Sequence, residues 1–331
     1  MPPMMLTQAH VVRRWCSIVG SLEGCLQSLD LDHSPAFVMG ASGHAFRINI
    51  EPTHICRTGP TVIDFRGDHL PLYNNLGVRF ELRQHWTDEP TYRAKQRVVW
   101  EAVLDSLEAR RPPIVWDADI PEFGLVIGHE PRGGRFTFST MPQPQPWHAS
   151  MNEVPRNVGM LRLFLPVERK NCDKRKAVYD SLAFAVRQSR AGCCYDNHLP
   201  GFSGYEAWIA AVREQRVLDD PYSHAYNAAV IYEARSLAVE YLREVVSLFE
   251  QPAGTHLSAA ADAFEQVAIS LREVHRLFPL PRDNEAPDPA VLPLGVTALE
   301  AAYKAEQRAL AAIIRAYPEF ADLEQVVAYG A

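Results

Sequence analysis

A cysteine and a histidine near the N-terminus are the residues whose types and spacing most clearly suggest chemistry. Cys16 directly precedes a stretch with apolar side chains at helical spacing, which are Val19, Leu22, Leu26 and Leu29. A cysteine in the first turn of a helix faces backbone N–H groups and the positive end of the helix dipole, which favour its thiolate. His44 follows in a Gly- and Ser-rich turn. The pair predicts a thiol nucleophile with a histidine-bearing loop behind it. The alternative is a buried small residue and a structural histidine.

Strand and helix signals that would position these residues fill the chain up to about residue 168. Strands are predicted over 46–50, 61–64, 78–82, 114–116, 123–127, 135–139 and 160–167, with a further short strand at 9–12. An amphipathic helix is predicted over 92–111, and Pro112 and Pro113 end it. The Pro- and Gln-rich segment 140–157 is typical of an irregular connection. Gly20 and Gly24 predict close packing of another segment on the first helix. Residues 1–168 therefore predict an α+β domain with an antiparallel sheet.

The second half, residues 169–331, has a different composition. Strand signals disappear, and Ala, Glu, Leu and Arg dominate. Helices are predicted over 173–189, 204–216, 222–250, 256–277 and 289–315. Asp219, Asp220 and Ser223 are typical of a helix N-cap, and Glu233 and Arg235 are interpreted as surface or inter-helix pairs. The half as a whole predicts an all-helical domain.

Composition and charge exclude several classes of function. The 33 basic and 40 acidic residues of the 331-residue chain give a net charge of −7, without the basic cluster of a nucleic-acid-binding protein. No apolar run approaches the length of a membrane span, and we expect no membrane partner. The six cysteines lack zinc-ligand spacing and are interpreted as reduced thiols of a cytoplasmic protein, with no metal or cofactor. A metal site at Cys193, Cys194, Tyr195 and His198 is disfavoured because the spacing fits no usual ligand pattern.

Four segments of the first half resemble a known family. These are Trp15–Leu29, Met39–Arg47, Val115–Asp117 and Glu122–His129. They resemble the N-terminal domain of butirosin biosynthesis protein H and its relatives, a divergent papain-like (cysteine-peptidase-like) fold. The motifs GYEAW at 204–208 and HAYNAAVIYEAR at 224–235 resemble the helical C-terminal extension of such proteins. The resemblance implies acyl transfer from a carrier-protein thioester to an amine, through a cysteine acyl-enzyme.

The sequence departs from this pattern at Glu122. Peptidase relatives carry the catalytic histidine where this chain has Glu122, in EFGLVIG. A carboxylate with an ordinary pKa near 4.3 is a weak base toward a thiol with a pKa near 8.5, and burial would improve the match. The proton acceptor is therefore Glu122, His44 or His129, or the thiol chemistry has been lost.

Two functions remain from these observations. The first is a cysteine-dependent acyltransferase or amide hydrolase acting on a small molecule, with Cys16, His44, Glu122 and Asp117 as catalytic residues. Asp117 would orient an imidazole, although it could equally cap the turn. Trp15, Ser42, Gly43 and His129 are expected to bind substrate. The rival is a non-catalytic papain-like protein that binds a small ligand or a carrier protein. The sequence leaves a homodimer open.

Overall fold

The computed structural model describes residues 3–141, 145–191, 197–282 and 285–323. The chain forms two compact units, and both are discontinuous in sequence. The first unit contains Met1–Val38 and Tyr73–Asp173, and the second contains Met39–Leu72 and Lys174–Ala331. The change near residue 173 lies close to the predicted change at 168. Residues 39–72, which the sequence suggests belong to the α+β half, group instead with the helices.

The first unit is built on an antiparallel sheet that contains seven strands within the described residues. The strand order is β3-β8-β4-β5-β6-β7, and β1 pairs with the C-terminal end of β5. The strands are β1 (Met4–Met5), β3 (Val78–Trp86), β4 (Ile114–Trp116), β5 (Phe123–Glu130), β6 (Arg135–Ser139), β7 (Trp147–Ser150) and β8 (Met160–Arg169). The predicted α+β architecture is confirmed at this level. β7 lies in the segment expected to be irregular, and the strand expected at 9–12 is absent.

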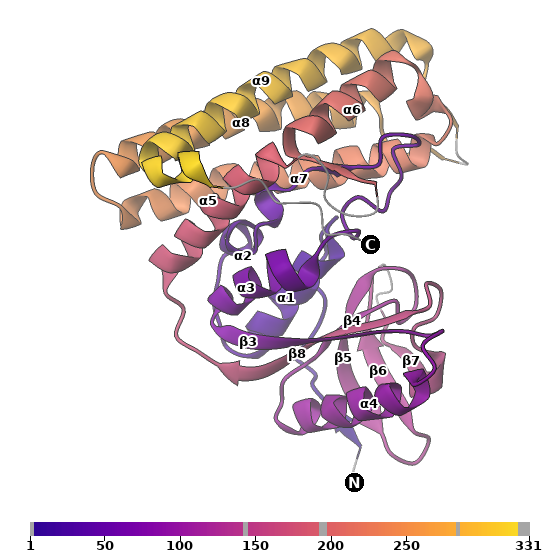
Figure 1. Cartoon of the computed structure of the whole chain (residues 1–331). Coiled ribbons are helices and arrows are strands. Elements are labelled where there is room, and N and C mark those ends of the chain that lie inside the picture. Colours follow the sequence, from indigo (N-terminus) through magenta and orange to yellow (C-terminus); the bar gives the residue numbers. More distant parts are fainter. Residues whose placement is uncertain (1–2, 142–144, 192–196, 283–284, 324–331) are drawn as a thin grey trace. The chain divides into compact units, whose positions relative to one another are not determined.

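Helices α1 (Ser17–Ser28) and α4 (Tyr92–Glu108) pack on opposite faces of this sheet (Figure 1). Leu125 of β5 faces Gly24 of α1, whereas Trp100 of α4 contacts Phe138, whose register partner on β5 is Val126. Successive residues of a strand point to opposite faces, so β5 is buried on both sides. Double burial explains its unbroken apolar sequence.

The glycine spacing of α1 accommodates the segment that precedes the helix. A Cβ atom on Gly20 would lie 2.1 Å from the carbonyl oxygen of Val12, and one on Gly24 would lie 1.8 Å from that of His10. The Val12 N–H donates to the Gly20 carbonyl at 3.1 Å. Residues 10–12 therefore lie directly on the helix, as the two glycines predict, but not as a strand.

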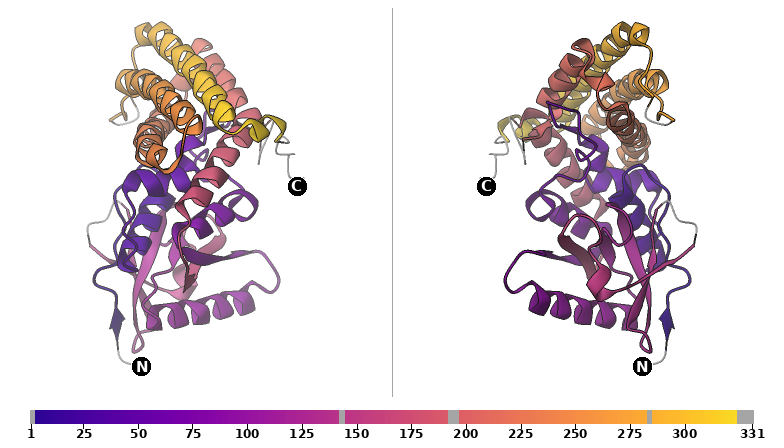
Figure 2. Two further views of the ribbon diagram at one scale, coloured as in Figure 1. Left: turned by 90° about the vertical axis from the view of Figure 1, so that its left-hand side faces the viewer. Right: turned by 90° about the vertical axis from the view of Figure 1, so that its right-hand side faces the viewer.

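The second unit is mainly helical. Its helices are α5 (Lys174–Arg190), α6 (Gly201–Arg213), α7 (Pro221–Val245), α8 (Ala253–Leu277) and α9 (Leu292–Ala316). Each lies within a few residues of a predicted helix. Helices α8 and α9 lie side by side along their lengths (Figure 2). Strand β9 (Leu199–Pro200) pairs with β2 (Asn49–Ile50), and among the described residues these two form a separate sheet.

Residues 39–72 form short elements within the second unit. A 3₁₀ turn at His44–Phe46 precedes β2, and a π turn at Phe65–His69 follows a loop over 51–62. Helices α2 (Pro35–Ala41) and α3 (Leu70–Tyr73) lie at the ends of this segment, where the chain passes between the units. The strand predicted over 46–50 is therefore shorter than expected, since only Asn49–Ile50 is a strand. The strand predicted over 61–64 is wrong.

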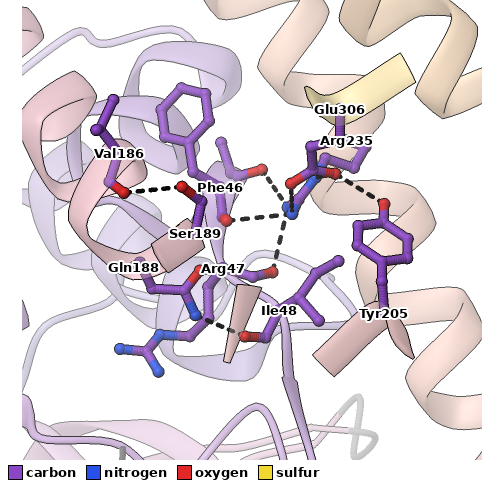
Figure 3. Close-up of polar contacts among 10 residues, drawn as sticks. Phe46, Arg47, Ile48, Val186, Gln188, Ser189, Tyr205, Arg235 and Glu306 are labelled. Carbon is purple, nitrogen blue, oxygen red and sulfur yellow. Dashed lines mark hydrogen bonds and ion pairs between the residues drawn. The ribbon is translucent and has the colours of Figure 1, made fainter. Parts of the chain in front are cut away.

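The side chain of Arg235, on α7, holds this segment in place (Figure 3). Arg235 is fully buried, and its guanidinium donates to the carbonyls of Ala45 (2.7 Å), Phe46 (3.1 Å) and Arg47 (3.1 Å). It also forms a two-point ion pair with Glu306 of α9, at 2.8 and 2.6 Å. Of the two predicted roles for Arg235, the inter-helix pair is confirmed and the surface position is wrong.

Within the described part of the chain, no helix is long and apolar enough to cross a membrane.

We predict that Arg235→Met destabilises the protein by about 3–5 kcal/mol, because it leaves the buried Glu306 carboxylate without its counter-ion. The double variant Arg235→Met/Glu306→Gln should recover part of this loss, since the neutral amide can still accept from Tyr205. Urea unfolding of both variants measures the difference.

The exposed pair of Arg213 and Glu300, at 2.8 Å between α6 and α9, provides the matched control. Arg213→Met should cost less than about 1 kcal/mol. Equal losses for the two arginine variants would contradict the importance assigned to burial.

Candidate active site

The thiol of Cys16 lies where the sequence predicts it, at the N-terminal end of a buried helix. Cys16 is the N-cap residue of α1 in extended conformation, and it is only 5% exposed. Its carbonyl accepts the N–H groups of Val19 (3.0 Å) and Gly20 (3.2 Å), which begins the helical hydrogen-bond pattern. The N–H groups of the first turn point out of the helix end, where they can stabilise a negative charge.

Glu122 lies at the same helix end. The Ser17 hydroxyl donates to its carboxylate, and the backbone N–H of Phe123 donates to the Ser17 oxygen at 3.0 Å. Ser17 is the first residue of α1, and Glu122 immediately precedes β5. These two bonds attach the start of the strand to the start of the helix. They place the Glu122 carboxylate against Ser17, the residue that follows Cys16.

The carboxylate of Asp117 has a structural environment. Asp117 is fully buried, and its carboxylate accepts from the backbone N–H groups of Asn157 and Val158, both at 2.7 Å, and from the Asn157 side chain at 2.6 Å. Its own φ is +60°, a conformation that residues with short polar side chains tolerate. Of the two predicted roles, the geometry favours fixing the turn over orienting an imidazole. The neighbouring Asp119 pairs with Arg156 at 2.9 Å.

His129 lies near the end of β5, half-buried against the ring of Phe136 at 4.7 Å. Its register partner on β1 is Met4, and burial lowers its pKa. Helix α1 begins beside Glu122, at the N-terminal end of β5, whereas six residues of extended strand separate Glu122 from His129. His129 therefore does not join Glu122 at the helix end, and the structure does not bring it to Cys16. Trp15, which precedes Cys16, is 37% exposed.

His44, Ser42 and Gly43 belong to the second unit. His44 is buried and stacks on His69 with ring centroids 4.4 Å apart. His69 contacts the Ser42 carbonyl through Nδ1 at 3.0 Å and accepts from Arg47 through Nε2 at 3.0 Å. Gly43 has a φ of +83°, and a Cβ atom there would lie 2.7 Å from Leu72 and 2.9 Å from Phe184.

The environment of His44 is unfavourable for proton acceptance. Burial, followed by the charge of Arg47, lowers the pKa of His44 to about 3. An imidazole with this pKa is a weaker base than a normal carboxylate. The sequence does not predict that His69 stacks on His44 or that Asp68 pairs with Arg47 at 3.5 Å, because no spacing links residues 44–47 to 68–69.

Comparison with known proteins adds no homologue to these observations. The chain matches no protein-family model and no curated protein. Among the described residues, no group of three or more His, Cys, Asp or Glu side chains could hold a metal ion. Cys16, Cys25, Cys56 and Cys172 are in the reduced form, whereas Cys193, Cys194 and Tyr195, considered above as metal ligands, lie outside the described residues.

We predict that Asp117→Ala lowers stability by about 2–4 kcal/mol, because it leaves two backbone N–H groups without their acceptor. Asp119→Ala, which removes only the pair with the half-exposed Arg156, should cost less than about 1 kcal/mol. Urea unfolding tests both. A similar small loss for the two variants would contradict the structural role of Asp117.

We also predict that His44 makes the protein less stable in acid. Its pKa is 6.5 in the unfolded chain and about 3 in the fold, so only the unfolded state binds a proton between these values. Stability therefore falls as pH decreases through this window, by about 1.4 kcal/mol per pH unit from His44. His44→Gln should reduce the slope of unfolding free energy against pH by that amount. An unchanged slope between about pH 6 and pH 4 would show that His44 titrates normally.

Proposed function

We propose that the protein is a cysteine-dependent acyltransferase or amide hydrolase that acts on a small molecule, with Cys16 as nucleophile. The observation that carries the proposal is the position of Cys16 as N-cap of α1, with the Glu122 carboxylate bonded to the adjacent Ser17. Thiol, helix N-terminus and carboxylate are the groups that a thiol acyl transfer requires. The family resemblance supports the same chemistry.

The proposed reaction uses Glu122 in place of an imidazole. Glu122 takes the proton from the Cys16 thiol, and the thiolate attacks the acyl carbonyl carbon. The backbone N–H groups of the first turn of α1 stabilise the resulting oxyanion. As the bond to the leaving group breaks, Glu122 returns the proton to it, which leaves a thioester on Cys16. An amine or water then attacks this thioester and loses one proton to Glu122, which passes it to the departing Cys16 sulfur.

The choice of acyl donor follows from the base. A carboxylate is a weak base toward a thiol, so the site requires a reactive acyl group. A thioester, free or on a carrier protein, is more reactive than an amide and is the expected donor. His44, with its pKa lowered to about 3, is not assigned the base role.

A second function is supported by the same carboxylate. Glu122 accepts from Ser17, which itself accepts from the N–H of Phe123, so the three residues can be explained as a structural connection between α1 and β5. A carboxylate at this end also competes with a thiolate for the helix dipole. The protein would then be a non-catalytic papain-like protein that binds a small ligand or a carrier protein.

We predict that an acetyl thioester of N-acetylcysteamine acylates Cys16 in the native protein. Intact-mass spectrometry with peptide mapping should find one acetyl group on Cys16, and Cys16→Ser should carry none at this position. Glu122→Gln should slow the acylation about a hundredfold if Glu122 carries the proton.

Whether Glu122→Gln slows or accelerates the modification of Cys16 distinguishes the two functions. Faster modification of Cys16 in this variant would show that the carboxylate only opposes a thiolate, which supports the binding protein. Ser17→Ala is the matched control, because it removes the contact with Glu122 but keeps the carboxylate. An unmodified Cys16 in the native protein would refute acyl transfer from thioesters.

A further inference from the structure

A second cysteine, Cys56, lies in the second unit within a chain of hydrogen bonds. The Thr58 hydroxyl donates to the Cys56 sulfur at 3.3 Å, and the same hydroxyl contacts Nε2 of His198 at 3.1 Å. Since a hydroxyl has one proton, His198 donates to Thr58 in this arrangement. Cys56 is half-buried, and His198 is 3% exposed. The Cys56 sulfur therefore accepts from a hydroxyl that itself accepts from an imidazole.

The loop that carries Cys56 is held by side chains that bond to its backbone. The amide of Asn227, on α7, donates to the carbonyls of Ile55 (3.2 Å) and Cys56 (3.1 Å). Asn49 donates to the carbonyls of Gly59 (3.0 Å) and Val62 (2.8 Å). Ile55 has a φ of +52°, which a β-branched residue rarely adopts. Positions held so firmly are typical of sites that need fixed geometry.

A buried polar atom in this loop points independently to a ligand. Asn227 is 1% exposed, and its Oδ1 has no hydrogen-bond partner within the described part of the chain. A Cβ atom on Gly59 would lie 3.2 Å from this oxygen, so the acceptor is inside the Cys56 loop. Buried acceptors are nearly always satisfied in folded proteins. An N–H group of a small bound molecule would satisfy this one.

The charge of Arg57, the residue that follows Cys56, indicates which molecules the thiol would bind. Arg57 is exposed, and its guanidinium lies over the ring of Tyr222, 5.7 Å from the centroid, while Tyr222 is itself 38% exposed. An exposed cation on the residue after a thiol favours anionic partners.

We propose that Cys56 is a thiol modification site that forms mixed disulfides with anionic low-molecular-weight disulfides. The Cys56 thiol loses its proton to water, and the Thr58 hydroxyl, which accepts from Nε2–H of His198, stabilises the thiolate by donating to it. The thiolate attacks one sulfur of the disulfide, a new S–S bond forms and the old one breaks. The leaving thiolate takes a proton from water. Cys56 and one half of the attacked disulfide form the mixed disulfide, and the other half is released as the reduced thiol.

Cys172 is the matched internal control. It is half-buried like Cys56, but its thiol donates to the Asn75 carbonyl at 3.3 Å, so the bond polarity at sulfur is reversed. In the native full-length protein, we expect oxidised glutathione and iodoacetamide each to modify Cys56 about tenfold faster than Cys172. Peptide mapping by mass spectrometry gives the rate at each cysteine.

Variants test the hydrogen-bond chain and the charge separately. Thr58→Val and His198→Gln should lower the Cys56 rate to that of Cys172, whereas Thr58→Ser, which keeps the hydroxyl, should retain the native rate. Arg57→Gln should slow modification by oxidised glutathione but not by uncharged iodoacetamide or cationic cystamine. Thermal unfolding of Thr58→Val and Thr58→Ser checks that both variants fold.

Several results would overturn the proposal. Equal native rates at Cys56 and Cys172 would show that the hydrogen-bond chain has no effect on reactivity. A slow Thr58→Ser variant would show that the hydroxyl is not the cause. An unchanged rate with oxidised glutathione in Arg57→Gln would refute the preference for anions. The Cys16→Ser variant should keep the Cys56 rate, so this proposal can fail or succeed independently of the proposed acyl transfer.

Discussion

The buried guanidinium of Arg235 is the interaction on which the second unit depends. All five of its N–H donors are used, three toward consecutive backbone carbonyls and two toward Glu306. The Tyr205 hydroxyl donates to the same carboxylate at 2.7 Å. One charge pair therefore links α6, α7 and α9 to residues 45–47. The cost of burying these charges is offset only because every donor has a partner. The three bonds to consecutive carbonyls fix the position of that backbone.

The position of residues 45–47 determines the surroundings of His44. The backbone that accepts from Arg235 includes Arg47, whose Nε donates to His69. His69 in turn stacks on the His44 ring. Burial and the Arg47 charge keep both imidazoles neutral, since both pKa values lie well below normal. A histidine that the sequence suggests as a catalytic base is thus part of a buried, uncharged stack. Its distinctive sequence context, a glycine-rich turn, reflects the close approach of Leu72 and Phe184 at Gly43.

Regular elements could be predicted from the sequence, whereas the grouping of residues 39–72 could not. Helices α4 to α9 carry apolar faces that repeat at the helical period, and β4, β5 and β8 are rich in apolar residues, so the local sequence pattern is sufficient. Residues 39–72 are held by single side chains, Arg235 and Asn227, that bond to backbone carbonyls nearly two hundred positions away. A backbone carbonyl has no sequence signature. The sequence likewise predicts that Asp117 could cap its turn but not which N–H groups donate to it, and the Cys56–Thr58–His198 chain joins side chains 140 positions apart.

At the Cys16 site, the sequence predicts the helix end but not how its positive potential is used. Cys16 and Glu122 both lie at the start of α1, and only one full negative charge is well stabilised there. An ionised Glu122 carboxylate repels a Cys16 thiolate, so the two do not carry negative charge together. When the carboxylate takes the thiol proton, the negative charge moves to the sulfur and the net charge at the helix end is unchanged. A carboxylate base therefore favours a thiol that loses its proton only during the reaction. Such a site would react with activated acyl groups and would not keep a standing thiolate, which distinguishes it from a cysteine–histidine pair.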